Sequence, residues 1–137
     1  MRVLVDTSVW SLALRRKTQS NQAAAVKLVQ IIEEEHQVFL TGVILMEILQ
    51  GVREVQQASK IRRYLECFPL LELDRLGYIN AASLHSKCRS KGIQSGTVDA
   101  LIAQTAIEKN CYLLTVDQDF EHIARCTSLK LMPIAPI

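Results

Sequence analysis

Short apolar runs alternate along this chain with longer segments in which apolar positions recur at helical spacing. The runs cover residues 2–5, 38–40, 70–73, 112–115 and 129–132. Runs of this length, bounded by polar or turn-forming residues, are typical of strands that are buried on both faces. We therefore expect five short strands, the first of which ends abruptly at Asp6.

The intervening segments have the apolar spacing and end signals of helices. We expect helices over residues 8–14, 22–35, 41–50, 54–67, 74–89, 97–109 and 118–124. Ser20, Asn21 and Thr97 are suitable N-caps, Gly51 follows the third helix, and Pro69 ends the connection after the fourth. Strands that alternate with helices predict an α/β fold with a central, mostly parallel sheet and helices on both faces. We expect one domain spanning residues 1–137.

Composition narrows the class of protein. The 137 residues suit a single domain, and 49% hydrophobic with 22% charged residues supplies enough apolar material for a packed core, so we do not expect disorder. No apolar run approaches the ~20 residues of a membrane helix. The apolar stretch after Arg2 is broken at once by Asp6, which is unlike a signal peptide. We expect a cytoplasmic protein that does not associate with membranes.

The cysteines fit a reducing compartment. They are widely separated, without a CxxC pair, at Cys67, Cys88, Cys111 and Cys126. We expect reduced thiols in largely structural positions. His85 lies three residues before Cys88 and His122 four before Cys126, and either spacing places two metal ligands on one helix face. Without a second pair of matching type, ordinary helix surface or core is the better interpretation than a zinc site.

Two acids follow predicted strands. Asp6 comes directly after residues 2–5, and Asp117 comes shortly after residues 112–115. Ligands of open parallel sheets bind beyond the carboxyl ends of the strands, so these carboxylates face each other if the two strands are neighbours. The alternative for Asp6 is a simple turn with a helix cap.

Two further acids lie on predicted helices. Glu47 is surrounded by apolar residues in the segment 43–49, where we expect a buried helix, so its carboxylate needs a partner. The alternative is a structural Glu–Arg pair. Asp99 lies in the first turn of the helix that follows Gly96, and its alternative is a favourable interaction with the helix dipole.

Brought together, four carboxylates would repel one another unless a cation lay between them. Oxygen ligands of this kind suit Mg²⁺ or Mn²⁺ rather than zinc. Such a cation supports metal-assisted hydrolysis of phosphodiesters. The acids therefore indicate a nuclease more than a purely structural role.

Four segments, in this order, carry a family resemblance. They are VDTSVW at residues 5–10, LMEILQG at 45–51, TVDALIAQTA at 97–106 and LLTVDQDF at 113–120. Together they resemble a PIN-domain ribonuclease of the small VapC type, the toxin of VapBC toxin–antitoxin pairs. The motifs run from Asp6 to Phe120 and so cover essentially the whole chain.

The resemblance implies a metal site formed by four acids. They are Asp6, Glu47, Asp99 and Asp117. Asp6 and Asp99 would be the firmest ligands of Mg²⁺ or Mn²⁺, and Asp119 is a rival to Asp117 for the last place. Ser8 and Thr115 resemble hydroxyl residues that line such sites, although a helix cap and a strand-end turn are alternatives.

The implied activity is endonucleolytic cleavage of RNA by a metal-activated water, leaving a 5′-phosphate and a 3′-hydroxyl. A homodimer and a cognate VapB-type antitoxin are implied with it. The alternatives are a PIN-like RNA-processing nuclease outside a toxin–antitoxin pair and a non-catalytic module that binds RNA or protein.

The charge that remains outside the site is basic. Setting the four site acids aside leaves ten acids against sixteen Lys and Arg. Candidate phosphate contacts are Arg15, Arg16, Lys17, Lys87, Arg89 and Lys91, and solvated helix surface is the alternative for each of them.

Overall fold

Five parallel strands form one sheet in the computed structural model, which describes residues 1–14 and 22–135. The strands are β1 (Arg2–Val5), β2 (Gln37–Thr41), β3 (Leu70–Leu71), β4 (Tyr112–Leu114) and β5 (Lys130–Leu131). Their order is β3-β2-β1-β4-β5, and every pairing is parallel. The predicted α/β class is confirmed, with an all-parallel rather than mostly parallel sheet.

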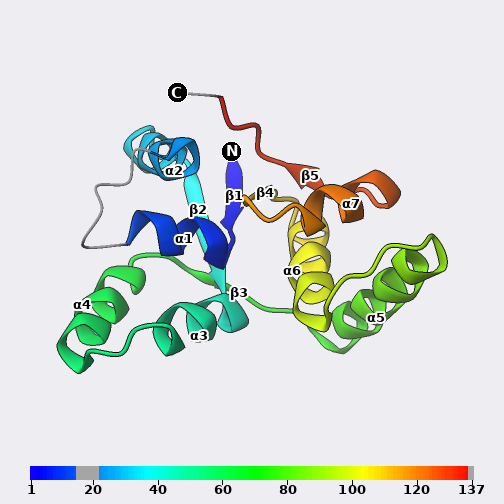
Figure 1. The fold of residues 1–137 in the computed structure, drawn as a ribbon, viewed down its shortest axis with the longest axis horizontal. Helices are drawn as coiled ribbons and strands as arrows, with labels where there is room; N and C mark the ends of the chain where they lie inside the picture. Colours follow the sequence, from blue (N-terminus) through cyan, green and yellow to red (C-terminus); the bar gives the residue numbers. More distant parts are fainter. Residues whose placement is uncertain (15–21, 136–137) are drawn as a thin grey trace.

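The described residues form seven helices around this sheet. They are α1 (Thr7–Ala13), α2 (Ala23–Glu33), α3 (Gly42–Gln50), α4 (Val55–Leu65), α5 (Arg75–Ser90), α6 (Thr97–Glu108) and α7 (Asp119–Cys126). Figure 1 shows α1 to α4 on one side of the strands and α5 to α7 on the other. Within the described ranges, no helix has the length and apolar character needed to cross a membrane.

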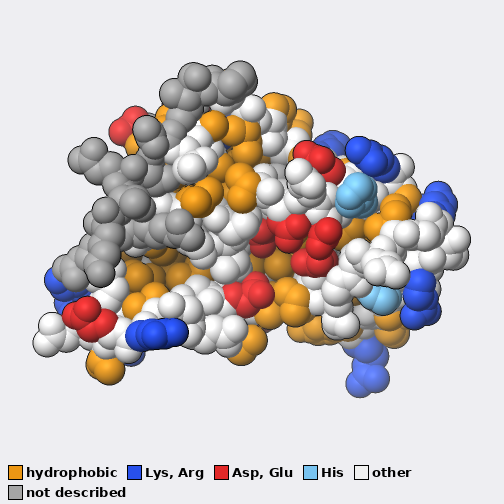
Figure 2. Space-filling view, in the orientation of Figure 1, with side chains coloured by type: hydrophobic (Ala, Val, Ile, Leu, Met, Phe, Trp, Pro, Cys, Tyr) orange, Lys and Arg blue, Asp and Glu red, His pale blue; other side chains and the backbone are white. Residues whose placement is uncertain are grey.

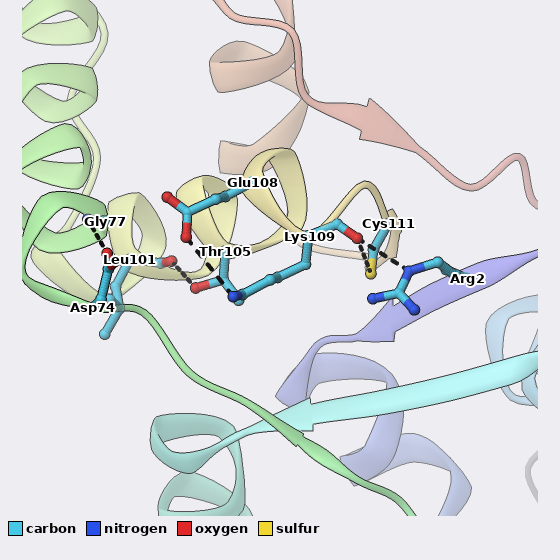
Figure 3. Close-up of polar contacts among 8 residues, drawn as sticks. All are labelled: Arg2, Asp74, Gly77, Leu101, Thr105, Glu108, Lys109 and Cys111. Atoms are coloured by element: carbon cyan, nitrogen blue, oxygen red, sulfur yellow. Dashed lines mark hydrogen bonds and ion pairs between the residues drawn. The ribbon is translucent and has the colours of Figure 1, made fainter.

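Local hydrogen bonds fix where several helices begin. The Thr41 hydroxyl accepts a hydrogen bond from the Ile44 N–H at 3.2 Å and caps α3. Asp74 caps α5 through the Gly77 N–H at 2.9 Å (Figure 3). The N-cap of α6 is Gly96, so the prediction that Thr97 caps this helix is wrong by one residue.

The first turn of α2 also differs from the prediction. Gln22 occupies the N-cap position and Ala23 is the first helical residue, whereas Ser20 and Asn21, the predicted caps, lie outside the described residues. Gln22 makes no side-chain capping bond, which leaves the apolar face of α2 to hold the helix in place.

The core lies on both faces of the central strand. Val3, Leu4 and Val5 of β1 are completely buried, as is Trp10 of α1. Burial of one such large apolar side chain contributes about 1.5–3 kcal/mol. The Trp10 indole N–H donates to the Val5 carbonyl at 3.1 Å, which fixes α1 directly against the end of β1.

One turn places β4 beside β1. Asn110 adopts a positive φ of 55° between α6 and β4, a conformation that Asn tolerates. Figure 3 shows Arg2 and Cys111 directed at the Lys109 carbonyl, which accepts from Arg2 Nε at 3.1 Å. In the resulting register Val5 lies opposite Leu114, so both strands end at the same rim.

Candidate active site at the carboxyl rim of the sheet

Asp6 stands at the end of the central strand. Its N–H donates to the Leu114 carbonyl at 2.9 Å, and its own carbonyl accepts from Val9 and Trp10 in the first turn of α1. Asp6 therefore occupies the N-cap position, but its side chain makes no capping hydrogen bond. Asp6 as a whole is 5% exposed, and its carboxylate is turned instead toward Ser8 and Thr115 at the rim of the sheet.

Two hydroxyls hold this carboxylate. Ser8 Oγ donates to Asp6 Oδ2 at 2.7 Å, and Thr115 Oγ1 donates to the same oxygen at 2.9 Å. Among the described residues, Asp6 Oδ1 accepts no hydrogen bond. Charge-assisted bonds of this length orient a carboxylate strongly. One oxygen is thus fixed by the protein, and the other is available to a ligand.

Thr115 also connects Asp6 to Asp117. The Asp117 N–H donates to Thr115 Oγ1 at 3.0 Å. Asp117 Oδ1 in turn accepts from the Asp119 N–H at 2.9 Å, at the start of α7. Asp117 is partly buried, whereas Asp119 is exposed and is the first residue of that helix. The chain of bonds from the Asp6 carboxylate thus reaches the backbone N–H of Asp117 first and continues from the Asp117 carboxylate to the backbone N–H of Asp119.

Asp99 approaches from α6, the helix on the other side of the rim. It lies in the first turn, where Asp99 Oδ2 accepts from the Gly96 N–H at 3.3 Å. Burial raises the pKa of the Asp99 carboxyl, the Gly96 bond opposes this change, and the charges of Asp117, Asp119 and Asp6 raise the pKa further. The helix-dipole interpretation is thus compatible with a position among other carboxylates.

Glu47 is joined to the strand end by one hydroxyl. Thr7 Oγ1 donates to Glu47 Oε1 at 2.8 Å. The expectation of a fully buried helix is wrong, because Met46 is 56% exposed and Glu47 itself is partly buried. Apolar residues on the outer face of α3 produced that error. Among the described residues, the side chain that bonds to Glu47 is a hydroxyl rather than an Arg.

The acids lie near one another without forming a closed ligand set. Figure 2 shows acidic side chains gathered in the middle of this face, between α1 and α6. In the described part of the chain, no three His, Cys, Asp or Glu side chains have the spacing of a formed metal site. The type of donor nevertheless fits a hard cation, since carboxylates and hydroxyls are oxygen ligands and Asp6 Oδ1 is available.

Some of the candidate phosphate contacts fall beyond the described ranges, and the others are exposed on α5 or at its end. Arg15, Arg16 and Lys17 lie outside the described residues. Lys91 is exposed at the C-cap of α5. In Figure 2, Lys and Arg side chains stand around the edge of this face, and one group of Asp and Glu side chains lies in its middle.

Thr7 is the site residue that the sequence prediction missed. It lies between Asp6 and Ser8, and a run of three polar residues directly after a buried strand was the available signal. In the structure, the Thr7 hydroxyl donates to Glu47, and the Asp6 carboxylate accepts from the hydroxyls of Ser8 and Thr115. The start of α1 is thereby connected to Glu47 of α3 and, through Asp6 and Ser8, to Thr115 in the segment after β4.

Comparison with known proteins agrees with the fold and the motifs. The family model described as "PIN domain" matches residues 3–125. Ribonuclease VapC11 of Mycobacterium tuberculosis is 30% identical over 131 residues, which cover 93% of this chain and 96% of that protein. VapC ribonuclease Mb1587 of Mycobacterium bovis matches to the same extent.

Solved structures share the architecture at lower identity. The VapBC2 structure of Rickettsia felis, bound to a promoter DNA fragment, superposes with a TM-score of 0.77 at 20% identity, covering 96% of this chain and 98% of that chain. VapC20 of Mycobacterium tuberculosis, a sarcin–ricin loop cleaving toxin, gives 0.64 at 19% identity, with 93% and 98% covered. The matched model and the identity to VapC ribonucleases over nearly the whole chain show that this protein belongs to the PIN domain family.

Proposed function

We propose that this chain is the toxin of a VapBC-type pair, a metal-dependent endoribonuclease with its active site at the carboxyl rim of the sheet. The observation that carries the proposal is the Asp6 carboxylate, which is buried, is held by two hydroxyls through one oxygen, and is one of three carboxylates whose charges raise the pKa of Asp99. The names of the VapC ribonuclease relatives support the same activity.

Asp6, Asp99 and Asp117 would hold a divalent cation, Mg²⁺ or Mn²⁺, with Glu47 completing the site. Ser8 and Thr115 orient the Asp6 carboxylate, and Thr7 orients Glu47. When bound, the cation would neutralise the gathered carboxylates, activate water and stabilise charge on the phosphate being cleaved. Asp119, exposed at the start of α7, remains the rival to Asp117.

The electrostatics of Asp99 support a role for a cation. Burial and three neighbouring carboxylates raise its pKa, so the ionised form of Asp99 is disfavoured at the rim. A divalent cation offsets this repulsion because it interacts favourably with every carboxylate at once.

RNA is the proposed substrate and a VapB-type protein the proposed partner. VapC20 is a toxin that cleaves the sarcin–ricin loop, and VapBC2 contains both members of a pair. A groove of about 380 Å³ between α1, α3 and α4 has Glu47 in its wall together with Leu14, Ile48 and Ile61. An antitoxin segment seated in this groove would lie beside the acids and could block them.

A homodimer is the proposed assembly. Leu76, Tyr78 and Ile79 at the start of α5 are each more than half exposed, as is Met46 on α3. Exposed large apolar side chains of this kind are typical of interaction surfaces. Measurement of the molar mass in solution by light scattering tests this part separately from the chemistry.

Cleavage of RNA by the purified protein tests the central proposal. We expect cleavage with Mg²⁺ or Mn²⁺, no cleavage in excess chelator, and no cleavage by Asp99→Asn. Asp74→Asn is the matched control, since it makes the same change at an exposed N-cap where Asn serves equally well. Cleavage that persists in chelator, or an Asp99→Asn variant as active as Asp74→Asn, would contradict the proposal.

The toxin role needs its own test. Expression of the parent chain should arrest bacterial growth, Asp99→Asn should not, and co-expression of a small protein encoded beside it should restore growth. RNA cleavage without growth arrest would instead support an RNA-processing nuclease outside a toxin–antitoxin pair.

A further inference from the structure

Two cysteines far apart in the sequence meet between α5 and α7. Cys88 Sγ and Cys126 Sγ lie 3.1 Å apart, although the residues are separated by 38 positions. Both are free thiols, Cys88 fully buried and Cys126 partly exposed at the last residue of α7. A disulfide bond is about 2.0 Å long, so a shift of about 1 Å brings the two sulfurs to bonding distance.

The neighbouring histidines do not convert this pair into a metal site. His85 Nε2 contacts the Ser95 carbonyl at 2.9 Å, and His122 Nδ1 lies beside Arg125 at 3.4 Å. Neither His–Cys pair noted in the sequence belongs to a metal site within the described residues, which contain no group of three suitable metal ligands. The Cys126 thiol also lies 3.5 Å from the Ile123 carbonyl, within its own helix.

We propose that Cys88 and Cys126 form a reversible disulfide, produced by peroxide, that ties the end of α5 to the end of α7. This inference does not depend on the proposed nuclease activity. It assigns a modification site to the side of the molecule that carries the last turns of both helices. Paired thiols in reducing compartments are commonly redox-sensitive rather than permanently bonded.

The accessibility of the two sulfurs sets the order of the steps. Burial and the hydrogen bond with Cys126 raise the pKa of the Cys88 thiol, so Cys88 stays protonated while Cys126, the less buried of the two residues, reacts first with peroxide. The Cys126 thiolate attacks one peroxide oxygen and hydroxide leaves, giving a sulfenic acid. Cys88 Sγ then attacks Cys126 Sγ, and the sulfenic oxygen leaves as water. One peroxide is reduced to two waters, and two thiols are oxidised to one disulfide.

The bond would join elements that support two of the site acids. The first turn of α7 is attached to Asp117 through its side chain and its carbonyl, while Gly96, in the loop after α5, bonds to Asp99. A crosslink between residues 88 and 126 also restricts the unfolded chain, since it closes a loop of substantial length. We therefore expect the oxidised protein to resist unfolding more than the reduced protein.

Treatment of the full-length protein with hydrogen peroxide tests the inference. The test uses a Cys67→Ser background, because Cys67 is exposed and can form intermolecular bonds. Intact mass should fall by two hydrogens, a non-reduced digest should contain the linked Cys88 and Cys126 peptides, and dithiothreitol should reverse both changes. The midpoint of urea unfolding should rise on oxidation.

Adding Cys126→Ala to the Cys67→Ser background supplies the control. This variant should show neither the linked peptide nor a higher midpoint of urea unfolding after peroxide treatment. A protein that accumulates sulfinic acid at Cys126 without the linked peptide would overturn the inference. Linkage to Cys111 in place of Cys88, or an oxidised form that unfolds at the same or a lower urea concentration, would also overturn it.

Discussion

Replacing Thr115 with Val tests the claim that hydroxyls hold the Asp6 carboxylate. Valine has the same shape as threonine, so the change removes a polar atom without opening a cavity. Thr115 Oγ1 donates to Asp6 Oδ2 at 2.9 Å and accepts from the Asp117 N–H at 3.0 Å. A hydrogen bond to a charged group contributes about 1.5–3 kcal/mol. Because Thr115 is partly exposed and water can replace part of the bond, we expect a loss of about 2 kcal/mol in unfolding free energy.

Thr105→Val is the matched control for this measurement. Thr105 is almost fully buried, and its hydroxyl donates to the Leu101 carbonyl inside α6 at 2.7 Å (Figure 3). That carbonyl belongs to the helix ladder, so the loss should be about 1 kcal/mol or less. Urea unfolding at neutral pH measures both values. If Thr115→Val costs no more than Thr105→Val, the Asp6 carboxylate does not depend on this hydroxyl and the description of the site is wrong.

Two further predictions concern stability. The pKa of Asp99 is raised above its usual 3.8, so the folded state binds this proton more tightly than the unfolded state, and ionisation of Asp99 lowers stability as pH rises above that value. Asp99→Asn should therefore stabilise the metal-free protein at pH 7 relative to the parent, and this gain in unfolding free energy should vanish below pH 3.8. Urea unfolding at a series of pH values measures the gain. A gain that stays the same at every pH would show that it does not come from the ionisation of Asp99. Gly77→Ala should lower the unfolding free energy by about 1–3 kcal/mol, since the new Cβ would lie 2.8 Å from Leu73 Cβ. The control is Gly42→Ala, whose Cβ would meet nothing within 4 Å. Equal unfolding free energies for the two variants would contradict the close packing of Gly77 against Leu73.

The central part of the fold was predictable because one physical signal dominated it. Val3, Leu4 and Val5 can be buried together only in a strand covered on both faces, and they are fully buried. The bounds of the short strand at the edge of the sheet were less predictable. The strand expected over residues 70–73 contains only Leu70–Leu71, since these two residues pair with Leu40 and Thr41 at the edge of the sheet.

The acids illustrate what a sequence pattern can and cannot specify. Positions 6 and 117 were predicted to share a rim because both follow strands, and the register of β1 and β4 confirms that shared rim. The partner of Glu47 was not predictable, since the Thr7 hydroxyl comes from a turn forty residues earlier and no local pattern reports such a contact. The approach of Cys88 to Cys126 was hidden for the same reason.

The most direct test of the central claim is the position of a bound cation. Crystals of the protein grown with Mn²⁺ can be measured at a wavelength where manganese scatters anomalously. We predict one strong anomalous peak at the carboxyl rim, with oxygens of Asp6 and Asp99 at a bonding distance of about 2.1 Å and Asp117 coordinated directly or through water. A map with manganese elsewhere and none at Asp6 would contradict the account of a metal-dependent nuclease.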